Sequence, residues 1–273
     1  MSGPIVLSGT QLAAELNAHT AARAAALPFA PTLATVLVGD DPGSATYVAM
    51  KRRRCSNHGL DSRFVHLPAE TTTVELIRVL TGLAADGGVH GILLQHPLPP
   101  QVDERAAFDA IPVTKDVDGT SSAAFAAAAL GRTGHRSCTP AGIVRLLDHY
   151  GVTLESADVT VVGRSAILGK PLAAMLIQRD ATVTVCHSRT RDLAAHTRRA
   201  DVLIAAAGRA GLITADMVRP GAVIVDAGFT PGDVTPGAAA RARAASPVPG
   251  GVGPMTIAVL LSQTVDAAEA SAG

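Results

Sequence analysis

The chain has 273 residues, of which 48% are hydrophobic, and this is enough to form the cores of two domains of modest size. Its 23 basic and 23 acidic residues leave no formal net charge. This balance excludes the strong positive field of a nucleic-acid-binding protein or of one that binds an anionic membrane.

Targeting segments and metal sites are also not predicted. No apolar run reaches the roughly 18 residues that a membrane span requires, and the N-terminus lacks the basic and apolar regions of a signal peptide. The cysteines, Cys55, Cys138 and Cys186, are odd in number and lack metal-ligand spacing. They indicate reduced thiols in a cytoplasmic protein without a bound metal.

Apolar, β-branched runs alternate with helical patterns along the chain. The expected strands are residues 33–38, 63–67, 89–94, 158–162, 182–186, 201–205 and 222–226, and the expected helices between them are 44–57, 72–85, 168–178, 190–196 and 214–218. The strand runs are continuously apolar, which is typical of parallel strands buried on both faces. Two such series predict an α/β fold with two domains.

The boundary between these domains is expected in the polar, turn-rich residues 131–140. A helix over 141–150 would bridge the halves, and a second helix over 255–270 would follow the Gly/Pro loop of 247–254. The Ala-rich residues 237–246 are interpreted as a plain surface helix.

Residues 161–170 read VVGRSAILGK, a buried strand, a turn at Gly163 and a helix with Gly169 near its start. Such a turn presents free N–H groups and the positive end of a helix to a phosphate. The spacing of Gly163, Ser165 and Gly169 differs from the common G-x-G-x-x-G. Its place at the head of a series of strand–helix units nevertheless predicts a dinucleotide site, and so a nicotinamide-dependent oxidoreductase.

The end of the next strand indicates which dinucleotide is bound. An NAD site usually places an acidic residue there to hold the ribose 2′-hydroxyl. Residues 186–191 instead read CHSRTR, and Ser188 with Arg189 would suit the 2′-phosphate of NADP. The alternative is that Arg189 and Arg191 are ordinary solvated residues of a first helical turn.

Polar residues of the first half form a second candidate site. Residues 38–51 read VGDDPGSATYVAMK, and Tyr47 and Lys51 share one helical face, a pairing that is common by chance. Gln95 stands at the carboxyl end of a buried strand, where sites of α/β proteins lie. Residues 115–119 read KDVDG, an acidic turn. Folding alone does not require two carboxylates in such a turn.

Taken together, these segments resemble the bifunctional methylenetetrahydrofolate dehydrogenase/methenyltetrahydrofolate cyclohydrolase family nearly from end to end. The matching stretches are VGDDPGSATYVAMK, GILLQHPLP, KDVDG, CTPAG, VVGRSAILGKPLA, ATVTVCHSRT and PVPGGVGPMT. The resemblance implies oxidation of 5,10-methylenetetrahydrofolate by NADP, followed by hydrolysis of the methenyl product to 10-formyltetrahydrofolate. It also implies a homodimer that pairs through the nucleotide domain.

The resemblance assigns roles to the first-half residues. Lys51 would be central to hydrolysis, and Gln95 would hydrogen-bond Lys51 and tune it. Tyr47 would pack on the folate, Asp118 would hold the pterin edge, and Ser44 would be a secondary contact. An unperturbed lysine, with a pKa near 10.4, is almost entirely charged at pH 7, so a basic role requires burial or a cationic neighbour.

The resemblance also implies a Rossmann-like NADP-binding domain over residues 139–254, facing a folate-binding catalytic domain over 1–138 that helix 255–273 completes. The active-site cleft would lie between them. The cofactor contacts would be Gly163, Arg164, Ser165, Ser188, Arg189 and Phe229, and the loop residues Pro249, Gly250 and Gly251 would lie beside the substrate.

The chain departs from the family pattern at several positions. His96 follows the glutamine where an apolar residue is more usual, and Phe229 replaces an aliphatic residue. The connection of residues 228–234 is shorter than usual. Three alternative functions are compatible with the same fold: a dehydrogenase without cyclohydrolase activity, a non-catalytic NADP-binding regulator, and an α/β dehydrogenase of another family acting on quinate-like or amino-acid substrates. The retained Tyr47, Lys51 and Gln95 argue against the first.

Overall fold

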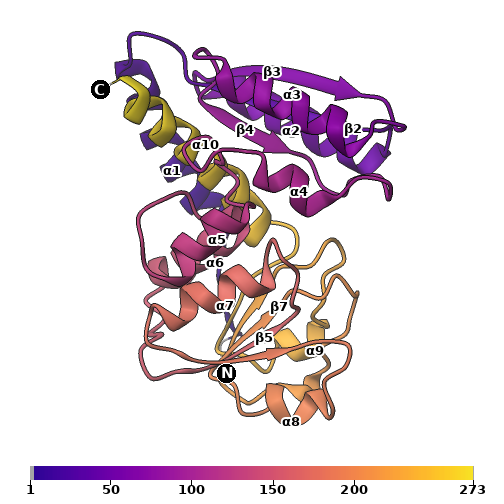
Figure 1. Cartoon of the computed structure of the whole chain (residues 1–273). Coiled ribbons are helices and arrows are strands. Elements are labelled where there is room, and N and C mark those ends of the chain that lie inside the picture. The colour runs from indigo at the N-terminus through magenta and orange to yellow at the C-terminus, as the bar shows by residue number, and fades with distance from the viewer. Residues whose placement is uncertain (1–2, 273) are drawn as a thin grey trace. The chain divides into compact units, whose positions relative to one another are not determined.

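The computed structural model describes residues 3–272, apart from the side chains of Ala45 and Tyr47. The chain forms two compact units, which are shown in Figure 1. The six-stranded unit comprises Met1–Ala14 and Thr139–Thr256, and the three-stranded unit comprises Glu15–Cys138 and Ile257–Gly273. Each unit combines a parallel sheet with helices, so the predicted two-domain α/β fold is confirmed.

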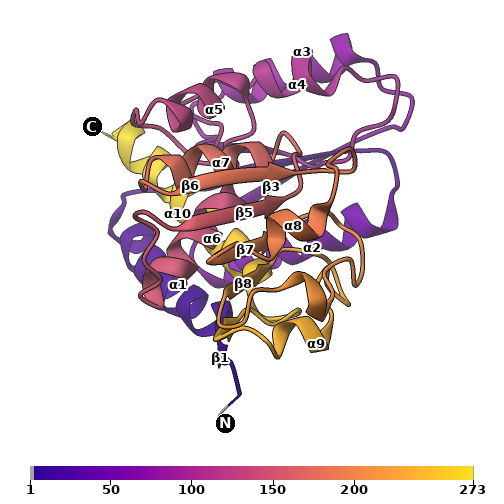
Figure 2. The ribbon, with the colours of Figure 1, turned by 90° about the horizontal axis from the view of Figure 1, so that it is seen from below.

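The sheet of the six-stranded unit is parallel throughout, in the order β1-β9-β8-β7-β5-β6 (Figure 2). Its strands are β1 (Ile5–Val6), β5 (Asp158–Val162), β6 (Thr182–Cys186), β7 (Val202–Ala205), β8 (Val223–Asp226) and β9 (Ala244–Ala245). The chain leaves β5 for β6 on one side and returns to β7 on the other. This reversal makes β5 and β7 a topological switch point, beyond whose carboxyl ends ligands bind in such sheets.

Successive side chains of the central strands enter two different hydrophobic cores, because neighbours along a strand point to opposite faces of a sheet. Val161 of β5 belongs to one core and Val162 to the other. The same alternation separates Ile204 from Leu203 in β7. Both faces of the sheet are therefore buried, which explains the continuous apolar runs in the sequence.

The connecting helices of this unit match most of the predicted ones. They are α6 (Cys138–His149), α7 (Gly169–Ile177), α8 (Leu193–Thr197), the 3-10 helix η1 (Ala215–Met217) and α9 (Pro236–Ala239). The prediction of a surface helix over 237–246 is wrong beyond Ala239. The chain there forms β9, and pairing of β9 with β1 and β8 overrides the helix propensity of an Ala-rich segment.

The N-terminal segment also differs from its predicted place in a domain of residues 1–138. Ile5 and Val6 pair with Ala244 and Ala245, which puts residues 3–14 in the six-stranded unit. Both side chains are more than half exposed, so β1 has neither the length nor the burial that identifies a strand from its sequence.

The three-stranded unit contains a smaller parallel sheet in the order β3-β2-β4. Its elements are β2 (Thr32–Val38), α2 (Pro42–Asn57), β3 (Asp61–Leu67), α3 (Thr73–Ala85), β4 (Gly91–Leu94), α4 (Glu104–Asp109) and α5 (Ser122–Ala129). One core joins β2 and β4 to α3 and α4, with Leu76, Leu80 and Phe108 fully buried. Because β3 and β4 flank β2 on opposite sides, β2 and β4 form the switch point of this sheet.

Two long helices complete the fold. α10 (Val252–Ala272) was predicted, but α1 (Gly9–Ala26) was not, because its Ala-rich sequence has little helical periodicity. Arg23 near the end of α1 forms ion pairs with Asp266 and Glu269 of α10, each at 2.5 Å. No helix within residues 3–272 is both long enough and apolar enough to cross a membrane.

The start of α3 gives a direct test of a local interaction. Thr72 accepts from the backbone N of Glu75 at 3.3 Å, and Glu75 accepts from the backbone N of Thr72 at 2.8 Å, forming a capping box. We predict that Thr72→Ala lowers the free energy of unfolding by about 1 kcal/mol, since the cap is lost. Urea unfolding measures this, with Val74→Ala, a change at a 78% exposed position of the same turn, as the control. Equal stability of the two variants would contradict the prediction.

Candidate active site

The sequence DDPGS begins helix α2, which carries the first-half candidate residues. Asp41 is the N-cap and accepts from the backbone N of Ser44 at 2.7 Å, and Pro42 occupies the first helical turn. Hydrogen bonds from the backbone and side chain of Ser44 hold the pKa of Asp41 below its usual value. Ser44 is 4% exposed, and its hydroxyl hydrogen-bonds the Asp41 carboxylate. Tyr47 lies one turn further along α2, and its side chain is outside the described part of the structure.

Lys51 and Gln95 come together although 44 residues separate them. Lys51 is buried, and its Nζ donates to Oε1 of Gln95 at 3.0 Å. Gln95 follows β4 directly, and its backbone N donates to Val36 O at 2.8 Å, which ties it to β2. Its Nε2 donates to His96 O at 2.6 Å, so the amide is oriented with its oxygen toward Lys51. The hydrogen bond therefore lies at the switch point of the three-stranded sheet.

Burial moves the pKa values of Lys51 and Asp118 in opposite directions, because it disfavours the charged form of each. It lowers the pKa of Lys51, an effect partly offset by attraction to Asp118. It raises the pKa of Asp118, and attraction to Lys51 and an interaction with the Cys138 thiol partly offset this. Both groups are brought closer to their neutral forms, which is the condition for Lys51 to accept a proton.

The two carboxylates of KDVDG have different roles. Asp116 is fully buried and accepts from the backbone N of Thr120 at 3.1 Å and of Ser121 at 2.8 Å. It therefore holds the turn together, and one carboxylate, that of Asp116, is used in folding the turn. Asp118 as a whole residue is partly buried, and its carboxylate interacts with Lys51 and the Cys138 thiol rather than with the backbone of the turn. Gly119, at φ +63°, allows this turn, because a Cβ there would lie 2.3 Å from the backbone carbon of Arg136.

Two thiols near Lys51 were not predicted to belong to the site. Cys55 and Cys138 are both buried, and each interacts electrostatically with Lys51. Burial raises the pKa of Cys55 to about 12 and that of Cys138 well above its usual value, so both are neutral thiols. The four-residue spacing of Lys51 and Cys55, one turn apart on α2, could have predicted that Cys55 lies near Lys51. No local sequence pattern predicts that Cys138 lies near Lys51.

His96, the departure from the family pattern, has a structural role beside the site. Its ring Nδ1 lies 2.7 Å from Oε2 of Glu104, and its peptide bond to Pro97 is cis. Its carbonyl is the acceptor that orients Gln95.

The predicted phosphate-binding turn in the six-stranded unit is shaped by two glycines. A Cβ on Gly163, at φ +138°, would lie 2.1 Å from Ala206 O, and one on Gly169 would lie 2.1 Å from Gly163 O. Ala206 follows β7, so this close approach occurs at the β5–β7 switch point. Ser165 Oγ accepts from the backbone N of Leu168 at 3.2 Å and of Gly169 at 3.4 Å, which leaves its proton free to donate to a ligand.

A second turn follows β6. His187 N donates to Thr190 Oγ1 at 2.8 Å, and Arg189 N donates to Nδ1 of His187 at 3.2 Å. These bonds use the polar atoms of His187 and Thr190 and leave the side chains of Ser188 and Arg189 exposed. Arg164, also exposed, follows the adjacent strand β5. A hydroxyl and two guanidinium groups therefore stand at the carboxyl ends of neighbouring strands.

The connection after β8 is held by two buried aspartates. Asp226 accepts from the backbone N of Asp233 at 3.1 Å and of Val234 at 2.9 Å. Asp233 accepts from the backbone N of Ala207 at 2.6 Å and of Gly208 at 2.9 Å. Phe229 is 74% exposed on this braced loop.

The Gly/Pro loop of Pro249, Gly250 and Gly251 also belongs to the six-stranded unit. Gly9 at the start of α1 donates its N–H to Gly250 O at 2.9 Å, and a Cβ on Gly9 would lie 1.9 Å from Gly251 O. Only glycine therefore fits at position 9. Pro249 is exposed, and the peptide bond before it is cis.

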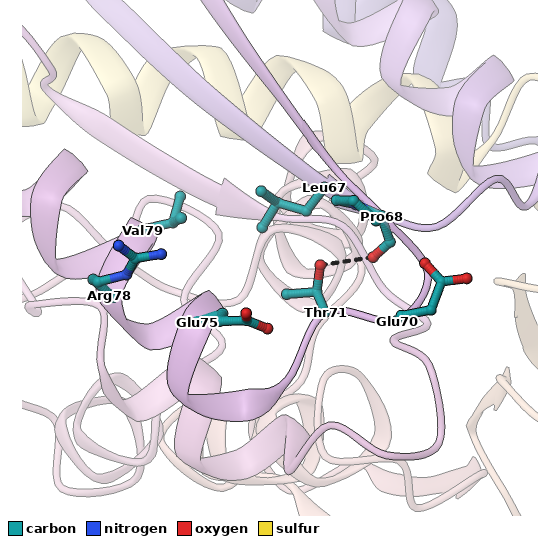
Figure 3. A pocket seen from close by; sticks show the side chains of 7 residues that line it. All are labelled: Leu67, Pro68, Glu70, Thr71, Glu75, Arg78 and Val79. Carbon is teal, nitrogen blue, oxygen red and sulfur yellow. Dashed lines mark hydrogen bonds between the residues drawn. The ribbon is translucent and has the colours of Figure 1, made fainter.

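A pocket of about 330 Å³ lies elsewhere in the three-stranded unit (Figure 3). It is lined by Leu67, Pro68, Glu70, Thr71, Glu75, Arg78 and Val79. None of the candidate residues borders it, Glu75 is occupied by the capping box, and Thr71 Oγ1 donates to Pro68 O at 2.7 Å. Two of its polar groups are thus used in the local structure.

The six-stranded unit has the strand–turn–helix geometry of a dinucleotide-binding domain, and the three-stranded unit has a buried lysine and a carboxylate at its switch point. These features define a two-domain α/β enzyme that uses a nicotinamide dinucleotide. Comparison with known proteins specifies it further. Residues 7–118 match the family model of the tetrahydrofolate dehydrogenase/cyclohydrolase catalytic domain, and residues 137–272 match that of the corresponding NAD(P)-binding domain.

Whole proteins are similar as well. The bifunctional protein FolD 1 of Streptomyces avermitilis is 56% identical over 271 residues, covering 96% of this chain and 94% of that protein. The bifunctional protein FolD of Shouchella clausii is 49% identical over 278 residues, covering 99% of this chain and 100% of that protein.

Solved structures agree with these relatives. The bifunctional FolD methylenetetrahydrofolate dehydrogenase/cyclohydrolase of Campylobacter jejuni is 39% identical, with a TM-score of 0.95 over 97% of this chain and 98% of that one. The Trypanosoma brucei enzyme, solved with NADP and an inhibitor, is 33% identical, with a TM-score of 0.95 over 100% of this chain and 99% of that one. The chain belongs to the tetrahydrofolate dehydrogenase/cyclohydrolase family.

Proposed function

We propose that this chain oxidises 5,10-methylenetetrahydrofolate with NADP and hydrolyses the methenyl product to 10-formyltetrahydrofolate. Family membership supports both activities, and the bifunctional relatives share most of the chain length. The observation that carries the second activity is the hydrogen bond from the buried Lys51 to Gln95. A dehydrogenase without cyclohydrolase activity would have no need of such a costly buried amine.

In the proposed hydrolysis, neutral Lys51 takes a proton from the water that attacks the methenyl carbon. The resulting carbinol then loses its hydroxyl proton while the bond to N5 breaks and N5 takes up a proton, so one proton is released overall. The lowered pKa of Lys51 favours the form that can act as this base. Gln95 keeps the amine oriented, because its oxygen is the acceptor that faces Lys51.

Asp118 is proposed to accept hydrogen bonds from the amino and ring N–H donors of the pterin. Its half-buried position and the neighbouring Lys51 support this role. Tyr47 is proposed to pack on the folate, and Ser44, Pro249, Gly250 and Gly251 are proposed as further substrate contacts. For Ser44 the cap of α2 is an additional, structural role.

The six-stranded unit has the features that an NADP site requires. Gly163 and Gly169 let the backbone come close at the switch point, and Ser165 has a hydroxyl proton available there. Arg164, Ser188 and Arg189 are proposed to bind the 2′-phosphate, and Phe229 to lie against the nicotinamide side. When bound, NADP accepts the hydride that leaves the methylene bridge of the substrate.

We also propose that the protein is a cytoplasmic homodimer that pairs through the six-stranded unit. Cys55, Cys138 and Cys186 are free and buried, which suits a reducing compartment. Strand β6 lies at the edge of its sheet, and Ile177 and Val185 are exposed apolar residues on α7 and β6. An open edge with apolar neighbours favours a second copy of the chain.

The proposed base can be tested by substitution and by pH. We predict that Lys51→Met lowers cyclohydrolase kcat/KM at least about 100-fold, as is typical when a general base is lost. In the wild type this rate should rise with pH as Lys51 loses its proton and level off below pH 10.5, because burial lowers the pKa from that value. The loss of methenyl absorbance with time measures the rate of the variant and the pH dependence of the wild type. Arg54→Met removes an exposed charge from the same helix and should have no effect; an active Lys51→Met enzyme would refute the role.

The preference for NADP can be tested at the turn after β6. We predict that Arg189→Ala raises the KM for NADP about tenfold and leaves the KM for NAD unchanged, since only NADP carries the 2′-phosphate. Arg191→Ala, two residues along the same loop, is the matched control. If the two variants have equal KM values for NADP, the assignment of Arg189 fails.

The dimer is tested by sedimentation equilibrium. We predict a two-chain mass for the wild type and a one-chain mass for Val185→Lys, because a charge on the edge strand opposes pairing. A wild-type protein that sediments as a single chain would exclude the dimer.

A further inference from the structure

The C-terminal helix α10 contains three consecutive buried polar residues, Ser262, Gln263 and Thr264, directly after the apolar run 257–261. Polar side chains are buried at a cost unless they form hydrogen bonds. Thr264 is satisfied within its own helix, because its Oγ1 donates to Leu260 O at 2.8 Å. Gln263 instead reaches out of the helix to a different part of the three-stranded unit.

The amide of Gln263 contacts two chain segments that are distant in sequence. Its Oε1 accepts from Arg136 N at 2.7 Å, and its Nε2 lies 2.9 Å from Arg136 O. The same Nε2 lies 2.7 Å from Val117 O and 3.4 Å from Sγ of Cys138. One side chain therefore links the KDVDG turn to the segment that begins α6.

Both segments border Asp118. Val117 directly precedes it, and Cys138 N donates to Asp118 O at 3.3 Å. The Cys138 thiol donates to Val117 O at 3.3 Å and also interacts with the Asp118 carboxylate. On the other side, Gly119 lies against the backbone of Arg136 so closely that no side chain fits. The position of Asp118 thus depends on how residues 117–119 and 136–138 are held together.

We propose that Gln263 is a positioning residue that sets the place of the Asp118 carboxylate for the folate substrate. This inference rests on the proposed role of Asp118. Gln263 does so by fixing the Val117 carbonyl and the Arg136 backbone with one rigid amide. Its effect is expected on folate binding in both reactions, because the same substrate contact serves both. NADP binding belongs to the other unit and should be unaffected.

The first test compares two substitutions at adjacent buried polar positions. Gln263→Met keeps the side-chain volume and removes every hydrogen bond, and Thr264→Val removes one bond within the helix. We expect Gln263→Met to raise the KM for methylenetetrahydrofolate about tenfold, with kcat and the KM for NADP within twofold of wild type. Thr264→Val should leave all three unchanged. The proposal would be overturned if Gln263→Met raised the KM for NADP as much as the KM for methylenetetrahydrofolate. It would also be overturned if the KM for methylenetetrahydrofolate did not change.

Gln263→Glu provides a second test if the methionine variant does not fold. A protonated glutamic acid can donate to Val117 O, whereas the carboxylate can only accept. We expect the ratio of the variant's folate KM to that of wild type to be small at low pH and to increase as pH rises. The ratio is used because both proteins share the other titratable and charged groups that surround this place, which are Lys51, Asp116, Asp118, Arg136, Cys55 and Cys138. A ratio that does not change with pH would contradict a positioning role.

Asp118→Asn separates failure of this inference from failure of the proposed function. If Asp118→Asn leaves the folate KM unchanged, the proposed role of Asp118 fails, and the inference fails with it. If it raises the folate KM and Gln263→Met does not, only the inference fails. If both raise it, the double variant should be hardly worse than Asp118→Asn alone, because the two residues act through the same contact. Fully additive effects would overturn the proposal.

Discussion

The burial of one lysine beside one aspartate is the constraint on which the candidate active site depends. A charged amine away from water is costly, and the protein reduces this cost through the Gln95 oxygen and the attraction of Asp118. The same burial raises the pKa of Asp118, so neither group can be considered alone. Removing Asp118 would lower the pKa of Lys51 further, and removing Lys51 would raise the pKa of Asp118 further, because each attracts the charged form of the other.

Both sheets place their polar residues by the same topological means. In each, one strand, β2 or β5, lies between the two strands that follow it in the chain, and the loops leaving adjacent strands diverge at the carboxyl edge. At one edge this brings α2 with Lys51 toward Gln95, and at the other it brings Gly163 against Ala206. The candidate catalytic residues and the nucleotide-binding turn thus lie at the topological switch points of two separate parallel sheets.

The sequence predicts those features that rest on local patterns, including the central strands, whose apolar runs reflect burial on both faces, and the glycine turn after β5. It does not reveal pairings between distant segments. Strand β1 is two exposed residues whose only strand feature is a partner at residue 244, and Gln263 contacts residues more than a hundred positions away. Likewise, composition and local pattern do not show that Asp116 holds the KDVDG turn, because its hydrogen bonds to Thr120 and Ser121 are seen only in the structure.

The pairing of β1 with β9 and the place of α10 have a consequence for biosynthesis. The six-stranded sheet needs Ala244 to bind Ile5, and the three-stranded unit needs residues 257 and beyond. A chain emerging from the ribosome therefore cannot complete either unit until residues 244–272 have been made. Both units would finish folding at nearly the same stage rather than one well before the other, which exposes their unfinished apolar surfaces to chaperones together.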